Sequence, residues 1–236
     1  MAEVFCRYAI NERMFQDYIT DKAPELTVAP TDADLQNMQA MLDDLAEGQG
    51  EHLRRYSNEE LESNVIYCAL CEVLIDHDVL PMHGSALCMD GEAYIFAAKS
   101  GTGKSTHSRF WREVYGERVW MINDDKPMLK ISDGRVTVLG NPWNGKHRLG
   151  RNASAPLKAI VRLTRDTGNH IEPLSKADAF QMMVERSYLS RDDARMAHIV
   201  ALEKQVVLAA ELYSLGCNMC PEAAVVAHDG MNEGKA

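Results

Sequence analysis

The chain has 236 residues, 46% hydrophobic and 25% charged, with a formal net charge of −10. This length and composition are typical of a globular protein with a sizeable core. The acidic balance argues against nucleic acid as a general partner, because phosphate contacts need a basic face. No apolar run approaches the roughly 20 residues that a membrane helix needs, and the first residues lack the blocks of a signal peptide. We therefore expect a cytoplasmic protein without a membrane partner.

Residues 1–78 are expected to form an N-terminal extension that packs on a core formed by residues 79–236. The alternation over residues 4–10 predicts a strand. A helix is predicted over residues 31–45, where Thr31 is the N-cap. A second helix is predicted over residues 57–75, since Ser57 followed three residues later by a glutamate fits a capping box.

The core begins with signals for a β-hairpin. Two apolar runs, residues 86–89 and 93–97, flank an Asp-Gly pair, which favours a tight turn. Residues 105–115 contain neither Gly nor Pro and precede Gly116, so a helix is expected there. Residues 118–122 then predict another strand.

Further along, Asp133-Gly134 predicts a second turn, and residues 140–156 read as a long loop. The stretch 175–236 is expected to be mostly helical. Its predicted helices cover residues 175–188 and 192–207 and a segment from residue 221.

Residues 98–106 read Ala-Lys-Ser-Gly-Thr-Gly-Lys-Ser-Thr, the pattern of a phosphate-binding loop, with Ala98 in place of its usual first glycine. The two glycines let the backbone turn its N–H groups inward around phosphate. Lys104 can reach the β- and γ-phosphates, and the Ser105 hydroxyl can bind Mg²⁺. The predicted nucleotide-binding residues are Ser100, Gly101, Thr102, Gly103, Lys104, Ser105 and Thr106.

Two acidic residues, Asp124 and Asp125, follow the predicted strand 118–122. In phosphoryl transfer, one carboxylate can assist the metal while another accepts the proton of the attacking hydroxyl. A solvated acidic turn is the alternative. His83 precedes the predicted hairpin, and a lone histidine beside an apolar strand is more often structural than functional.

Residues 82–105 together with Asn123-Asp-Asp125 resemble the core of the HPr kinase/phosphorylase and ATP-dependent PEP carboxykinase superfamily. Pro142-Trp-Asn-Gly-Lys146 and the Asn152–Leu157 segment are similar to compact HPr-kinase-like proteins of bacteria. The resemblance implies an α/β P-loop kinase fold, a mixed sheet with β-hairpins flanked by helices, that uses ATP and Mg²⁺. The residues that match its functional positions are His83, Lys104, Ser105, Asp124 and Asp125.

The resemblance has limits. Residues 140–156 do not read like the loop with which HPr kinases grip their protein substrate, and their separate N-terminal domain is not recognisable in residues 1–78. A PEP carboxykinase needs a longer chain. HPr is therefore not assumed to be the substrate, and decarboxylation is not expected.

The loop 140–156 is the predicted acceptor site. It carries Lys146, Arg148 and Arg151 next to His147, a basic cluster that can clamp a carboxylate or phosphate. A solvated basic loop is the alternative. Trp143 in the same loop could be a lid residue or a core anchor.

These features predict a kinase that moves the γ-phosphate of ATP to a hydroxyl of a small molecule or a protein serine. Asp124 is the expected base and Asp125 the metal-assisting acid beside Ser105, although the two roles could be exchanged, and His83 would orient the phosphate or metal. Two alternatives stay open: a nucleotide-binding sensor or maturation partner, and phosphorolysis of a phosphoprotein. A homo-oligomer is also left open.

Two cysteine pairs, Cys68 with Cys71 and Cys217 with Cys220, have the spacing of metal ligands. Neither pair has the turn glycines of a zinc knuckle. Packing as small core residues is favoured over structural zinc or a disulfide.

Overall fold

The computed structural model describes residues 1–50, 52–99, 101–145 and 147–232. The chain divides into two compact units, Met1–Leu74 and Ile75–Ala236. The sequence places the boundary after residue 78, and the packing of the first unit on the second stays a prediction. Among the described residues, no helix is both long and apolar enough to cross a membrane.

The first unit combines a small parallel strand pair with helices. Its elements are β1 (Ala2–Val4), α1 (Ala9–Met14), the 3-10 turn η1 (Gln16–Tyr18), β2 (Leu26–Val28), α2 (Asp32–Gln49) and most of α3 (Asn58–Asp76). The predicted caps are confirmed: Thr31 forms a capping box with Asp34 at the start of α2. The Ser57 hydroxyl accepts the backbone N–H of Glu60 at 3.3 Å before α3.

The prediction of a strand over residues 4–10 is wrong. Strand β1 ends at Val4, and α1 begins at Ala9. Between them, the backbone N–H groups of Arg7 and Tyr8 donate to the carboxylate of Glu62, at 2.6 and 3.3 Å. A distant carboxylate thus satisfies donors that a strand would have paired with a neighbour.

The second unit is built on a nine-stranded mixed sheet. Seven of its strands have the order β3-β7-β8-β9-β5-β4-β6, and the other two, β11 and β10, continue from β9. The strands are β3 (Val79–Pro81), β4 (Ser85–Met89), β5 (Glu92–Ala97), β6 (Val119–Asn123), β7 (Met128–Ser132), β8 (Arg135–Leu139), β9 (Ser154–Arg165), β10 (His170–Pro173) and β11 (Glu211–Cys217). This confirms the predicted α/β class with a mixed sheet.

Both predicted Asp-Gly turns are confirmed. Asp90 and Gly91 have φ of 52° and 86° and join β4 to β5. Asp133 and Gly134, with φ of 51° and 72°, join β7 to β8 in the same way. Positive φ at both central residues gives the turn a twist that matches the flanking strands.

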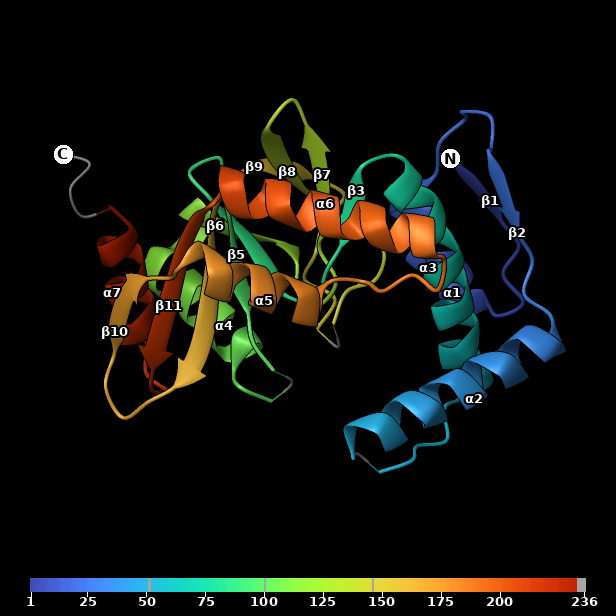
Figure 1. The fold of residues 1–236 in the computed structure, drawn as a ribbon, viewed down its shortest axis with the longest axis horizontal. Helices are drawn as coiled ribbons and strands as arrows, with labels where there is room; N and C mark the ends of the chain where they lie inside the picture. The colour runs from blue at the N-terminus through green and yellow to red at the C-terminus, as the bar shows by residue number, and fades with distance from the viewer. Residues whose placement is uncertain (51, 100, 146, 233–236) are drawn as a thin grey trace. The chain divides into compact units, whose positions relative to one another are not determined.

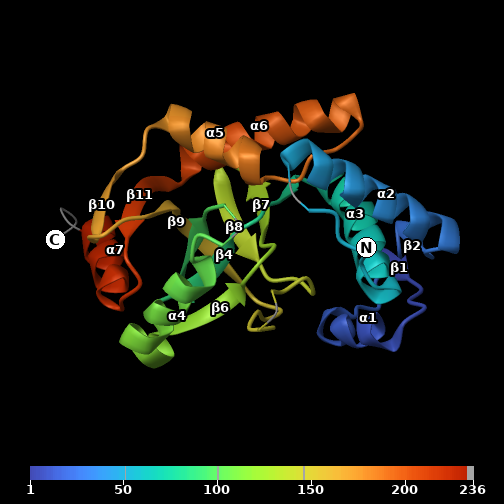
Figure 2. The same cartoon turned by 90° about the horizontal axis from the view of Figure 1, so that it is seen from below.

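Helices cover both faces of this sheet. They are α4 (Lys104–Tyr115), followed by the 3-10 turn η2 (Gly116–Arg118), α5 (Lys176–Arg186), α6 (Asp193–Ala209) and α7 (Glu222–Asn232). Figure 1 shows α5 and α6 in front of the strands, and Figure 2 shows the sheet between these two helices and the pair α4 and α7. Alternate side chains of β5 pack into the cores on the two faces of the sheet. Ile95 belongs to the core under α5 and α6, and Phe96 belongs to the core under α4 and α7.

The stretch 175–236 contains a strand that the sequence analysis did not predict. The three predicted helices are confirmed as α5, α6 and α7, but β11 lies between α6 and α7. It pairs in parallel with β9 and antiparallel with β10. These partners lie far away in sequence, so the local pattern does not reveal the strand.

The topology brings several chain segments to one edge of the sheet. Strand β5 runs parallel to β9, and β4 is antiparallel to both β5 and β6. The carboxyl ends of β5 and β6 therefore meet at the edge where β4 begins. This edge carries the loop after Ala97, the acid pair after Asn123 and the segment before Ser85.

Candidate functional site

The loop between β5 and α4 has the backbone that its two glycines predict. Gly101 has φ of 75° and Gly103 φ of 123°, values that favour glycine. Gly103 is the N-cap of α4, and among the described residues no side chain caps the helix there. The first N–H groups of α4 have no partner within the helix, so this end of α4 attracts anions.

Arg165, the last residue of β9, holds the loop from outside. Its Nη2 donates to the carbonyl oxygen of Gly101, and its Nε donates to that of Thr102 at 3.4 Å. Holding these carbonyls outward favours the inward direction of the neighbouring N–H groups. Arg165 is therefore a positioning residue that the sequence analysis missed.

Lys104 opens α4 and is only 9% exposed. Its Nζ donates to the carbonyl oxygen of Ala98 at 3.0 Å. Burial and the positive charge of Arg186 lower the pKa of Lys104, while Asp125 opposes this shift. A buried ammonium gains from an anion close by, because its own desolvation is then offset.

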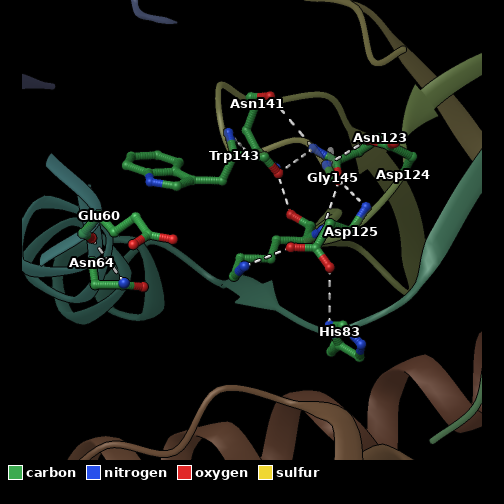
Figure 3. Close-up of polar contacts among 10 residues, drawn as sticks. Glu60, Asn64, His83, Asn123, Asp124, Asp125, Asn141, Trp143 and Gly145 are labelled. Carbon is green, nitrogen blue, oxygen red and sulfur yellow. Dashed lines mark hydrogen bonds and ion pairs between the residues drawn. The ribbon is translucent and has the colours of Figure 1, made fainter. Parts of the chain in front are cut away.

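Asn123 fixes the turn that carries the acid pair. It is fully buried, and its Oδ1 accepts the backbone N–H groups of Asp125 at 2.9 Å and Lys126 at 2.7 Å. Its Nδ2 donates to the carbonyl oxygen of Trp143 at 3.1 Å. Figure 3 shows these bonds, which join the turn after β6 to the loop before β9. The loop predicted over residues 140–156 is shorter than expected, because β9 begins at Ser154.

The two carboxylates have different surroundings. Asp124 is 7% exposed, and its Oδ1 accepts the backbone N–H of Gly145 at 2.7 Å. A Cβ added at Gly145 would lie 3.0 Å from Asp124 Oδ2, so a larger residue there would displace the carboxylate. Asp125 instead lies between an ammonium and an imidazole, with Lys126 Nζ at 2.6 Å and His83 Nδ1 at 3.4 Å (Figure 3).

His83 is held at the edge of the sheet by its backbone, whose N–H donates to the carbonyl oxygen of Arg186 at 2.6 Å. Burial, with Lys104 as the next cause, lowers the pKa of His83 to about 4 despite the opposing charge of Asp125. The imidazole is therefore neutral at neutral pH. One of its ring nitrogens can then donate a hydrogen bond, and the other can accept one.

These groups line one cavity of about 650 Å³. The predicted site residues that line it are His83, Gly101, Gly103, Lys104, Ser105, Thr106, Asp124, Asp125 and His147. Residues from the start of β4, the loop, α4 and the end of β6 thus converge, as the topology of the sheet requires.

Other predicted site residues lie elsewhere. Thr102 lines two smaller cavities instead. The structure does not bring Arg148 or Arg151 to the 650 Å³ cavity: Arg148 is exposed, and the Arg151 guanidinium lies 5.6 Å from the centre of the Trp120 ring. Ser100 and Lys146 lie outside the described residues.

The same cavity contains residues that the sequence analysis missed. They are Ser85, Ser108, Arg109 and Arg112. Ser85 and Ser108 are buried and share a hydrogen bond of 2.7 Å. The signal for Ser108 and the two arginines was present, since with Ser105 they follow a helical spacing of three and four residues.

A metal ion in this cavity would need ligands in addition to its side chains. Among the described residues, no group of three or more His, Cys, Asp and Glu side chains could hold a metal ion by itself. Mg²⁺ commonly needs only one or two carboxylates in addition to phosphate and water.

The cysteines Cys217 and Cys220, at the end of β11, are free thiols, and burial raises the pKa of Cys217.

Comparisons with known proteins place few constraints on this chain. No protein-family profile matches it, and no curated protein is similar to it. Among solved structures, it is similar to the HPr(Ser) kinase/phosphatase from Coxiella burnetii, with a TM-score of 0.37 and 11% sequence identity. That match covers 66% of this chain and 99% of the other chain. A likeness at this TM-score supports neither an activity nor a site.

Proposed function

We propose that this protein is an ATP- and Mg²⁺-dependent phosphotransferase of the HPr-kinase-like P-loop type, which moves the γ-phosphate to a hydroxyl. The observation that carries the proposal is the convergence of Lys104, Asp124, Asp125 and His83 on one cavity beside the amino end of α4. Phosphoryl transfer needs these parts together: donors for phosphate oxygens, a carboxylate base and an acid near the metal.

The phosphate side consists of α4 and the loop that precedes it. The N–H groups in the first turn of α4, which have no partner within the helix, and the buried ammonium of Lys104 would donate to the β- and γ-phosphate oxygens. Such donors stabilise the charge that spreads over the transferring group. Arg165 would keep the loop in this conformation.

The residues present also fit a magnesium ion. The Ser105 hydroxyl is exposed at the start of α4, and Asp125 lines the same cavity. We propose that these two residues hold the ion, which would neutralise charge on the β- and γ-phosphates when bound.

Asp124 is the proposed general base. Its carboxylate accepts only the Gly145 N–H among the described residues, whereas Asp125 is paired with Lys126. Among the described residues, the Asp124 carboxylate thus lines the cavity without an ion pair. Asp124 would take the proton of the acceptor hydroxyl while the oxygen forms its bond to the γ-phosphorus and the bond to ADP breaks. Neutral His83, beside Asp125, would orient the γ-phosphate.

The proposal is tested by nucleotide binding and turnover in matched lysine variants. Lys104→Ala removes the buried ammonium, and we expect ATP affinity to fall about tenfold or more. Lys130→Ala is the control, because Lys130 is on β7 and binds the carbonyl oxygen of His77 outside the cavity. Equal ATP affinity in wild type and Lys104→Ala would show that the loop does not bind phosphate. Binding without transfer to any hydroxyl would instead favour a nucleotide sensor.

A further inference from the structure

The 650 Å³ cavity continues beyond the acid pair along one face of α4. Ser105, Ser108, Arg109 and Arg112 all line it. Because they are spaced by three and four residues, they form one stripe along the helix. With a rise of about 1.5 Å per residue, this stripe extends on the order of 10 Å from Ser105 to Arg112. The cavity thus has a second end that carries two arginines.

The charge of Arg112 is not neutralised. Its Nε is buried without a hydrogen-bond partner, and within the described part of the chain no carboxylate forms an ion pair with it. Arg109 has one weak pair, with Glu113 at 3.6 Å, and both side chains are about half exposed. The two guanidinium groups therefore still have donors for an anion that enters the cavity.

Both arginines line the same cavity as Asp124 and Asp125. Long side chains on a helix lean toward its amino end, which in α4 is the end that begins at the loop. A guanidinium group binds carboxylate or phosphate through two parallel hydrogen bonds. In a protein with a net charge of −10, such a pair would also counter the general repulsion of anions.

We infer that the hydroxyl compound phosphorylated in this cavity is a small anion, and that its carboxylate or phosphate group binds to Arg112 and Arg109 on α4. The inference rests on the proposed function and names the acceptor class. The acceptor would lie with its hydroxyl toward Asp124 and its anionic group toward α4. A cavity of about 650 Å³ is within the usual range for small-molecule sites.

Inorganic phosphate is the first probe of the arginine end. The protein is saturated with Mg²⁺ and the non-hydrolysable ATP analogue AMP-PNP, and phosphate is then titrated by calorimetry. We expect wild type to bind one phosphate and Arg112→Gln to bind it at least about tenfold more weakly. The control is Arg135→Gln, because Arg135 is an exposed arginine of β8 outside the cavity, and it should match wild type.

Three results of this titration overturn the inference. They are no phosphate binding by wild type, equal phosphate affinity in Arg112→Gln, and a tenfold loss of AMP-PNP affinity in Arg112→Gln, which would place Arg112 in the nucleotide site. The titration is repeated without nucleotide on the Lys104→Ala variant, where the loop is weakened. Failure to bind AMP-PNP refutes the proposed function. The phosphate affinities of wild type and Arg112→Gln, measured without nucleotide, can still be compared in that case.

The second test identifies the class of the acceptor directly. An acid-soluble bacterial extract is separated on an anion exchanger, and each fraction is incubated with γ-labelled ATP, Mg²⁺ and protein. Label transfer should occur only with the retained, anionic fraction, and Arg112→Gln should reduce it at least about tenfold. Transfer with the unretained fraction, or unchanged transfer by Arg112→Gln, contradicts an anionic acceptor. Transfer with neither fraction contradicts the small-molecule reaction itself.

Discussion

Replacement of Asp124 by asparagine separates the chemical role of this residue from its structural role. The Oδ1 atom of Asp124 accepts the Gly145 N–H at 2.7 Å. Asparagine keeps an oxygen that can accept this bond, so the loop before β9 should stay in place. The other carboxylate oxygen becomes an NH₂ group, which cannot accept a proton. We therefore expect unchanged ATP affinity and a loss of about 10²- to 10⁴-fold in kcat.

The assay is single-turnover transfer from γ-labelled ATP, with ATP affinity measured separately. Asp124→Ala is the matched comparison, because it also removes the acceptor for Gly145 and should lower stability by about 1–3 kcal/mol. Asp124→Asn should melt close to the wild-type temperature. Turnover of Asp124→Asn within about threefold of wild type would refute the role as base. If only Asp125→Asn loses turnover, the roles of the two acids are exchanged.

Three further predictions concern the groups around the site and in the core. Arg165→Ala removes two hydrogen bonds to the loop carbonyls, so ATP affinity should fall about three- to tenfold with little change in kcat, and unchanged affinity in calorimetry would contradict this. Because the pKa of His83 is lowered to about 4, its ring signals in NMR should not titrate between about pH 8 and 5.5, and a midpoint near the ordinary 6.5 would be contrary. Glu203 in α6 is fully buried, and burial raises the pKa of its carboxyl, so the folded state holds its proton to a higher pH than the unfolded state does. Glu203→Gln should therefore stabilise the protein increasingly as pH rises above about 4.3, by about 1.4 kcal/mol for each unit of that shift, and a gain in urea unfolding that does not depend on pH would contradict it.

Local chemistry made much of the second unit predictable. Asp90-Gly91 and Asp133-Gly134 need positive φ at both positions, and such turns depend on few distant contacts. The order of strand, loop, helix, strand and acid pair around Lys104 also follows from short-range signals. Strands β5 and β6 flank β4, and both are antiparallel to it. Once this is known, the meeting of His83, the loop and the acid pair follows from topology.

What could not be predicted depends on partners distant in sequence. The residues after Val4 leave the strand because Glu62 accepts their N–H groups, and β11 exists because β9 and β10 flank it. The basic loop 140–156 suggested an acceptor site at Arg148 and Arg151. Arg109 and Arg112 of α4 line the cavity instead, because α4 begins at the loop and one face of this helix borders the same cavity.

The most direct test of the proposed phosphotransfer follows the fate of the γ-phosphate. Wild type and Lys104→Ala are incubated with γ-labelled ATP, Mg²⁺ and a clarified bacterial extract, and labelled species are separated from free phosphate. We predict a new labelled species with wild type only, in the acid-soluble fraction. Bound ATP whose label stays in place or appears only as free phosphate would contradict a kinase.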